Sequence, residues 1–300
     1  MNSICLSVAA NLRCQALSRT EQFILVAPAA VELLFFPFSL SLARHAHRTR
    51  WLLVLDGLVF PALAAADVVA HLIPALYTSF HVFAPLDTAL AAASALPIAL
   101  YTLFLVLFAR THLVSQALPP RIARVAAPAL IATVAPTVAF AALAAVLGLA
   151  HTIVRIPGQT PDAPSRIVLA IGFTSPILQR LSLFFGAAAL ALLVLLQALL
   201  FSLAFFRIAR GLLDERRIAN KAKYAAEASE ESHASTAVAK ATGPEEVHRF
   251  RGLPYIALGL KLGAIEALVG IFAPAFAGAL ARRVLRLFAR GFLVAGIIKG

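Results

Sequence analysis

Long apolar runs recur along this chain and constrain its fold more than any other feature. A transmembrane helix needs about 20 consecutive apolar residues to cross a hydrocarbon core of about 30 Å. Runs of this kind lie at 23–43, 51–76, 86–109, 123–150 and 181–206, with a further apolar segment at 254–280. We therefore predict an all-α, polytopic transmembrane helical bundle of five to six spans, with seven as a further alternative.

The composition excludes an ordinary soluble domain. Of the 300 residues, 61% are hydrophobic and only 13% are charged, against about 25% charged residues in soluble domains. The formal net charge is +12, but the arginines lie in short clusters between the apolar runs. Such clusters are typical of loops that face anionic lipid headgroups. We therefore expect the lipid bilayer as the partner of these charges and no nucleic acid.

The loops alternate in charge, which predicts an orientation. The second loop has no Lys or Arg and the fourth contains Arg155 and Arg166, whereas the connection from 207 to 251 has nine Lys or Arg. Three arginines lie in each of the first and third loops, namely Arg44, Arg48 and Arg50, and Arg110, Arg121 and Arg124. Because positive loops are retained in the cytoplasm, the N-terminus is predicted to be outside or lumenal. The sequence specifies neither the membrane nor the oligomeric state.

Four segments follow from this pattern. Residues 1–22 form an outer N-terminal tail, and 23–206 a five-helix transmembrane domain. Residues 207–252 form a cytoplasmic helical extension and a polar, flexible linker, where a cytoplasmic protein partner could bind. Residues 253–300 combine a membrane-embedded apolar segment with a basic amphipathic helix.

The basic C-terminal helix is expected to lie on the membrane surface. Arg282, Arg286 and Arg290 are four residues apart and share one helical face, a pattern typical of interfacial helices. We predict that these arginines and Lys261 contact lipid headgroups. Three topologies remain open here: six spans with a basic outer tail, a segment 254–280 that turns back around Pro274, or a seventh short span.

The stretch GLKLGAIEALVG at 259–270 contains a packing stripe. At about 100° per residue, Gly259, Gly263, Gly270 and Glu266 share one side of a helix, and Lys261 lies on the opposite side. Small residues allow a neighbouring helix to approach closely. We therefore predict that the glycines mark a helix–helix contact and that Glu266 points into it.

Acidic residues inside the apolar runs are the candidate functional groups. Glu32, Asp67, His71 and Glu266 are the candidates for an intramembrane polar site, either a cavity or a proton path. The alternative is that each group is hydrogen-bonded to a neighbouring helix and only fixes packing. Asp56 lies near the predicted start of its span, so we expect it to be hydrated.

Catalytic and cofactor motifs do not occur in the sequence. There is no Gly-x-x-x-x-Gly-Lys, His-Glu-x-x-His or Gly-x-Ser-x-Gly pattern, and Cys5 and Cys14 have no metal-ligand spacing. We therefore predict no catalytic residues, metal or cofactor, and favour a protein that is not an enzyme.

The order of a basic helix, a polar linker, GLPYIALGLKLGAIEALVG and ARRVLRLFARGFLVAGIIKG resembles that of uncharacterised multi-pass membrane proteins of basidiomycete fungi. The resemblance covers mainly residues 207–300 and implies no activity or cofactor. The leading hypothesis is a scaffold-like or sensor-like membrane protein that acts through its basic cytoplasmic loop. The alternatives are a small transporter or proton-coupled carrier that uses the buried carboxylates, a seven-helix receptor-like protein, and an intramembrane enzyme.

Overall fold

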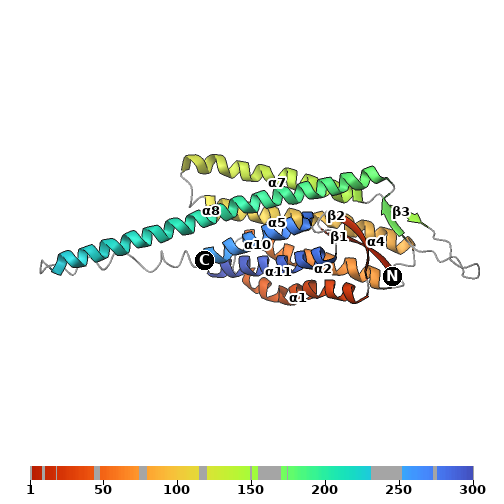
Figure 1. The fold of residues 1–300 in the computed structure, drawn as a ribbon, viewed down its shortest axis with the longest axis horizontal. Coiled ribbons are helices and arrows are strands. Elements are labelled where there is room, and N and C mark those ends of the chain that lie inside the picture. The colour runs from red at the N-terminus through yellow and green to blue at the C-terminus, as the bar shows by residue number, and fades with distance from the viewer. Residues whose placement is uncertain are drawn as a thin grey trace, which may run out of the picture.

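A computed structural model shows the chain as a bundle of long helices with two short hairpins of strands (Figure 1). Side chains are described within most of the helices. The structure describes residues 2–8, 11–17, 19–43, 48–73, 80–114, 120–148, 151–154, 170–173, 175–230, 252–272 and 276–299.

Up to α8 the helices cover most of the predicted apolar runs. In chain order they are α1 (Arg19–Ala43), α2 (Arg48–Leu72), α4 (Phe80–Ala93), α5 (Ala95–Phe108), the π-helical turn η1 (Ala109–Val114), α7 (Pro120–Gly148), α8 (Pro176–Glu230), α10 (Leu253–Phe272) and α11 (Phe276–Lys299). α4, α5 and η1 follow one another with only Ser94 outside them, and they form one rod.

The two hairpins were not predicted from the sequence. β1 (Asn2–Val8) pairs antiparallel with β2 (Asn11–Leu17), and β3 (His151–Val154) pairs antiparallel with β4 (Ala170–Phe173). Both hairpins lie at the end of the bundle where the N-terminus is drawn, and the C-terminus lies toward the other end (Figure 1).

Seven helical rods of the described chain pack in sequence order around a closed ring. α1 packs on α2, α2 on α5, α5 on α7, α7 on α8, α8 on α10 and α10 on α11. α11 then packs on α1, which closes the ring. Each helix therefore contacts the helix that precedes it and the one that follows, as short connections favour.

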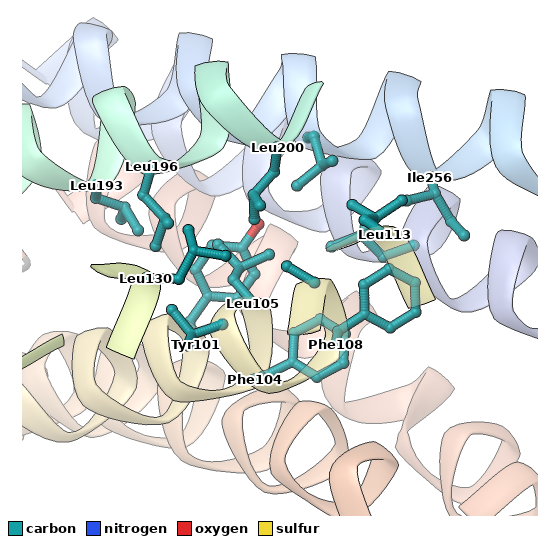
Figure 2. Close-up of a cluster of buried hydrophobic side chains, with 14 of the residues drawn as sticks. Tyr101, Phe104, Leu105, Phe108, Leu113, Leu130, Leu193, Leu196, Leu200 and Ile256 are labelled. Carbon is teal, nitrogen blue, oxygen red and sulfur yellow. The ribbon is translucent and has the colours of Figure 1, made fainter. Parts of the chain in front are cut away.

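The apolar core lies around the third rod. Tyr101, Phe104, Leu105 and Phe108 of α5 are almost fully buried, and they pack against leucines of α8 such as Leu196 (Figure 2). The α5 sequence ALPIALYTLFLVLF is apolar on every side, which suits a helix that is surrounded by others. α5 thus contributes a large part of the apolar core.

α8 is much longer than the bundle. Its 55 residues correspond to a rod of about 80 Å at 1.5 Å per residue. The second half projects beyond the other helices as an arm (Figure 1). The sequence analysis predicted that the fifth helix continues past 206, and the helix indeed extends to Glu230.

The C-terminal segment differs from the prediction. The apolar segment 254–280 is not one helix, because α10 ends at Phe272 and α11 begins at Phe276. α11 runs antiparallel along α10, with Gly259 beside Leu293 and Gly270 beside Arg282. Pro274 lies outside the described residues. The two helices form a hairpin inside the bundle rather than a span followed by a surface helix.

Four helical segments among the described residues are long and apolar enough to cross a membrane: Thr88–Val114, Ala123–Leu147, Pro176–Leu213 and Leu253–Phe272. Two shorter apolar stretches, Phe23–Pro37 and Trp51–Ala66, lie in α1 and α2. These lengths and compositions fit a helical membrane protein.

Candidate functional site

The arginines of α11 point into the bundle. Arg282, Arg286 and Arg290 are only 4%, 4% and 6% exposed, and Arg283 is buried as well. The prediction that the first three contact lipid headgroups from a surface helix is therefore wrong. Amphipathic spacing shows that one face is charged, but it does not say whether that face meets water or other charged side chains. Here the charged face meets carboxylates of three other helices.

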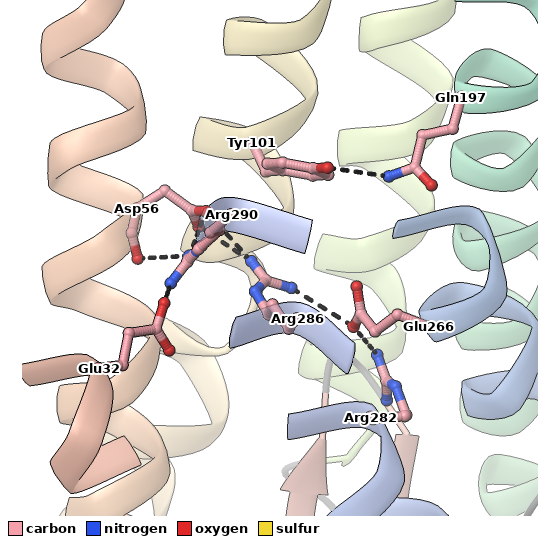
Figure 3. Close-up of polar contacts among 8 residues, drawn as sticks. All are labelled: Glu32, Asp56, Tyr101, Gln197, Glu266, Arg282, Arg286 and Arg290. Atoms are coloured by element: carbon pink, nitrogen blue, oxygen red, sulfur yellow. Dashed lines mark hydrogen bonds and ion pairs between the residues drawn. The ribbon is translucent and has the colours of Figure 1, made fainter. Parts of the chain in front are cut away.

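Asp56 is the centre of the network. Its side chain is fully buried on α2, and Arg286 donates to its two oxygens at 3.0 and 3.3 Å (Figure 3). Arg290 forms a second ion pair with Asp56 and also donates to its backbone carbonyl at 2.7 Å. The expectation of a shallow, hydrated Asp56 is wrong, because its side chain is fully buried and is contacted by Arg286 and Arg290 of α11.

Glu266 forms the second anionic position. It is buried on α10, and its Oε1 accepts a hydrogen bond from Arg282 at 3.3 Å. Arg286 Nη1 lies 3.6 Å from the same oxygen, so Arg286 bridges Glu266 and Asp56 (Figure 3). The carboxylate thus points toward α11, the closest neighbour of α10.

Glu32 of α1 completes the set of carboxylates. It is buried and forms an ion pair with Arg290. About two turns away along both helices, Arg283 donates to the backbone carbonyl of Leu25 at 2.5 Å. α1 is therefore held against α11 through both a side chain and its backbone.

Aromatic and amide groups surround the charges. The guanidinium of Arg286 lies 3.9 Å from the ring centroid of Phe60 and 5.5 Å from that of Tyr101, which is cation–π geometry. The Tyr101 hydroxyl accepts a hydrogen bond of 3.2 Å from Gln197 of α8 (Figure 3). The network thus extends from α1 across the interior to α8.

The charges of the core network balance. Glu32, Asp56 and Glu266 carry three negative charges, and the three arginines that pair with them carry three positive charges. Buried charges are costly unless they are paired and hydrogen-bonded. Because the partners come from α1, α2, α10 and α11, separation of any of these helices would leave a charge unpaired. The network therefore stabilises the position of α11 in the ring.

A cavity opens beside the network. It has a volume of about 470 Å³ and lies between α1, α2 and α11, with Tyr255 of α10 also in its wall. Glu32 and Arg290 are its charged lining residues, and the rest of the wall is mainly aliphatic and aromatic. Asp56 and Glu266 do not line it.

The structure brings two of the four residues of the predicted polar site into one network. Glu32 and Glu266 lie in one network, linked through Arg290, Asp56 and Arg286. Asp67 and His71 belong to α2, but their side chains lie outside the described residues.

The glycine stripe is a region of close packing. A Cβ at Gly259 would lie 2.9 Å from the backbone oxygen of Ala289, and one at Gly270 would lie 2.7 Å from the Arg282 side chain. Gly263 instead faces α5 and α8, where a Cβ would lie 2.8 Å from Gln197. Lys261 is exposed on the opposite side of α10. The stripe therefore contacts three helices rather than one.

Comparison with protein-family models, curated proteins and solved structures gives no significant match. Among the described residues, no group of three or more His, Cys, Asp or Glu side chains is placed to hold a metal ion. The buried ion-pair network and its adjoining cavity are therefore the features on which a functional proposal can rest.

Sequence reasoning missed the arginine partners of the carboxylates, although a signal was present. Charged residues within apolar helices usually face the bundle interior and pair with one another. Three carboxylates are buried among the residues whose side chains the structure describes, and the sequence has a row of arginines spaced at i, i+4 and i+8. That match in number and sign could have placed α11 inside the bundle.

Proposed function

We propose that this chain is an integral, multi-pass membrane protein of the seven-helix, receptor-like type, and that it acts as a sensor. The bundle would register a change at the network, and the α8 arm would present that change to a cytoplasmic partner. The proposal combines the sensor-like hypothesis with the seven-helix alternative, both of which came from the sequence. The closed ring of seven rods supports it.

One observation carries the proposal: α11 is amphipathic with its charged face turned inward. The arginines are buried, whereas Phe288 on the outer face is 54% exposed. In water this arrangement would be unfavourable, because the apolar side would face solvent. In a bilayer it is the favoured one, since charges pair inside and apolar groups meet lipid. α11 therefore supports a seventh membrane crossing.

The charge distribution supports the orientation with the N-terminus outside. With seven crossings, the connection 207–252 and the C-terminus would lie on the same, cytoplasmic side. In Figure 1 the C-terminus and the α8 arm lie toward one end, away from the N-terminal hairpin. Arg121 and Arg124, exposed at the start of α7, belong to the same basic side.

The α8 arm offers a surface for an acidic partner. Arg210, Arg216, Arg217 and Lys221 are exposed on it. Leu212 and Leu213 between them are more than half exposed, which adds apolar contact area. Because α8 also carries Gln197 and packs on α10, the arm is continuous with a helix that reaches the network.

A distance measurement tests the sensor proposal. Cys5 and Cys14 are replaced by Ser, and spin-labelled cysteines are placed at the exposed positions Lys221 and Arg121 in full-length protein in nanodiscs. We expect the distance distribution to shift or broaden when Asp56→Asn and Arg286→Gln together remove one charge of each sign from the network with no change in net charge. Lys261→Gln, an exposed charge outside the network, is the control. Identical distributions in all three proteins would contradict coupling between the network and the arm.

A proton-coupled carrier is the second candidate, and the cavity that reaches Glu32 favours it. A carrier would show a pH-dependent flux in reconstituted vesicles that Glu32→Gln abolishes. The sensor proposal instead expects no flux above that of protein-free vesicles. The two candidates are therefore separated by one assay.

A further inference from the structure

The cavity beside the network has the properties of a ligand site. Its volume of about 470 Å³ lies within the range of about 300–1,000 Å³ that is usual for small-molecule pockets. Such pockets are mainly apolar and contain a few polar groups that orient the ligand. Here the charged groups are Glu32 and Arg290, and the apolar wall includes Phe36, Val54 and Val294.

Two glycines keep this space open. A Cβ added at Gly57 of α2 or at Gly291 of α11 would meet no atom within 4 Å, and both residues line the cavity. At Gly259 and Gly296, by contrast, a Cβ would come within 3 Å of backbone atoms of the facing helix. Close helix packing therefore explains why positions 259 and 296 are occupied by glycine, but it does not explain the glycines at 57 and 291.

The polar end of the cavity is formed where Glu32 and Arg290 meet. Oε1 of Glu32 is occupied by its ion pair with Arg290, and Glu32 itself is 8% exposed and lines the cavity. Pro61 has no N–H, so the carbonyl of Gly57 lacks the i+4 donor that a regular helix supplies. A ligand hydroxyl could donate a hydrogen bond to the carboxylate of Glu32 or to the carbonyl oxygen of Gly57.

The charge balance selects the kind of ligand. Glu32 and Arg290 already neutralise each other at the cavity end, within a network of equal positive and negative charges. A carboxylate or ammonium group would add an unpaired charge in an apolar wall, which is strongly unfavourable. A neutral hydroxyl adds none.

We propose that the cavity between α1, α2 and α11 binds a neutral, mainly apolar lipid through a single hydroxyl group at Glu32 and Arg290. This inference rests on the proposed membrane function, because the ligand would enter from the bilayer and act on the network. From Arg290 to Ile298 the cavity follows α11 for eight residues, or about 12 Å. That length fits a sterol skeleton or part of a monoacylglycerol chain.

Photo-crosslinking of the full chain in nanodiscs tests the inference. Two diazirine probes distinguish the lipid sources: a photoreactive sterol and a photoreactive monoacylglycerol. A photoreactive fatty acid, measured at a pH at which it is ionised, is the charged control. We expect at least one neutral probe to label peptides of α1, α2 or α11 that line the cavity, and at least five-fold more strongly than the fatty acid. Equal labelling by the fatty acid would overturn the assignment of a neutral ligand.

Cavity-filling variants identify the site. Gly57→Leu and Gly291→Leu place a side chain in open space, and each should reduce the specific labelling at least five-fold. Ala62→Leu, at an exposed position on α2 outside the cavity, is the matched control and should retain it. A melting temperature within a few degrees of the parent protein verifies that each variant is folded. Labelling that persists in both folded glycine variants would show that the probe binds elsewhere and would contradict the proposal.

The binding and sensor experiments can fail independently. If the neutral probes label the cavity but do not change the distance between positions 121 and 221, the site stands and the sensor proposal fails. If the distance responds to the network variants but no neutral probe labels the cavity, the sensor proposal stands and this ligand assignment fails.

Discussion

Arg290 contacts both the side chain and the backbone of Asp56, a residue 234 positions away in the sequence. Its guanidinium pairs with the carboxylate and donates to the carbonyl oxygen of the same residue at 2.7 Å. The contact to the backbone of Asp56 specifies the position of α11 along α2. The contact to the carboxylate specifies the rotation of α11 about its own axis. Together they align the last helix of the chain with the second one.

Removal of the Asp56 charge should strongly destabilise the protein. In Asp56→Asn, Arg286 and Arg290 both lose an anionic partner while they remain buried. Breaking a buried ion pair on one side costs about 3–5 kcal/mol. We expect a clear fall in melting temperature in detergent.

A charge-balanced double variant separates this effect from a general loss of packing. Asp56→Asn with Arg286→Gln removes one charge of each sign, so it should be less destabilising than the sum of the two single variants. Strict additivity of the two changes in unfolding free energy would show that these residues are not coupled.

The glycines provide a second, independent prediction. Gly259→Ala should destabilise the protein by about 1–3 kcal/mol, because the new Cβ would lie 2.9 Å from the backbone oxygen of Ala289, which cannot rotate away. Gly57→Ala is the matched control, since the same methyl group meets open space and alanine favours a helix by roughly 0.5–1 kcal/mol. Equal melting temperatures of the two variants would contradict the packing of α10 on α11.

Much of the fold could be predicted from the sequence because the length of an apolar run indicates whether a helix can cross a bilayer. Boundaries such as Ala43 of α1 follow from where the apolar run ends and arginines begin. The position of α11 could not be read in the same way. Its helical period places Arg282, Arg286 and Arg290 on one face, but that period is the same whether the face meets headgroups or carboxylates.

The candidate site was predicted only in part for a related reason. Glu32 and Glu266 were recognisable because a carboxylate in an apolar run is unusual. The hydration of Asp56 was predicted from its distance to the end of the apolar run. That distance estimates the depth of a residue in the membrane, but it does not show whether side chains of another helix bury it. The cavity depends on Gly57 and Gly291 facing the same space from different helices, and no local pattern shows that.

The hydrogen bond between Tyr101 and Gln197 leads to a third prediction. Tyr101→Phe removes the acceptor of the Gln197 amide N–H, and the carbonyl oxygen of Gln197 already has no hydrogen-bond partner in the described structure. An unsatisfied buried polar group costs about 1–3 kcal/mol. Tyr224→Phe, on the exposed arm of α8, removes the same hydroxyl at a side chain that is 70% exposed. It should have no measurable effect on the melting temperature, whereas an unchanged melting temperature for Tyr101→Phe would count against a buried Tyr101–Gln197 contact.

The last prediction concerns the side of the membrane on which each end lies. Seven crossings have an odd number, so the two termini must be on opposite sides. An epitope tag before Met1 should be accessible on intact cells or sealed right-side-out vesicles, whereas tags after Ala228 and after Gly300 should be accessible only after permeabilisation. The tag at 228 controls for orientation, since the basic connection from 207 to 251 should remain in the cytoplasm. A protected tag at 228 with an accessible one at 300 would mean that α10 and α11 together cross an odd number of times. The arginines of α11 would then pair with Asp56 without a seventh crossing, and the receptor-like proposal would fail.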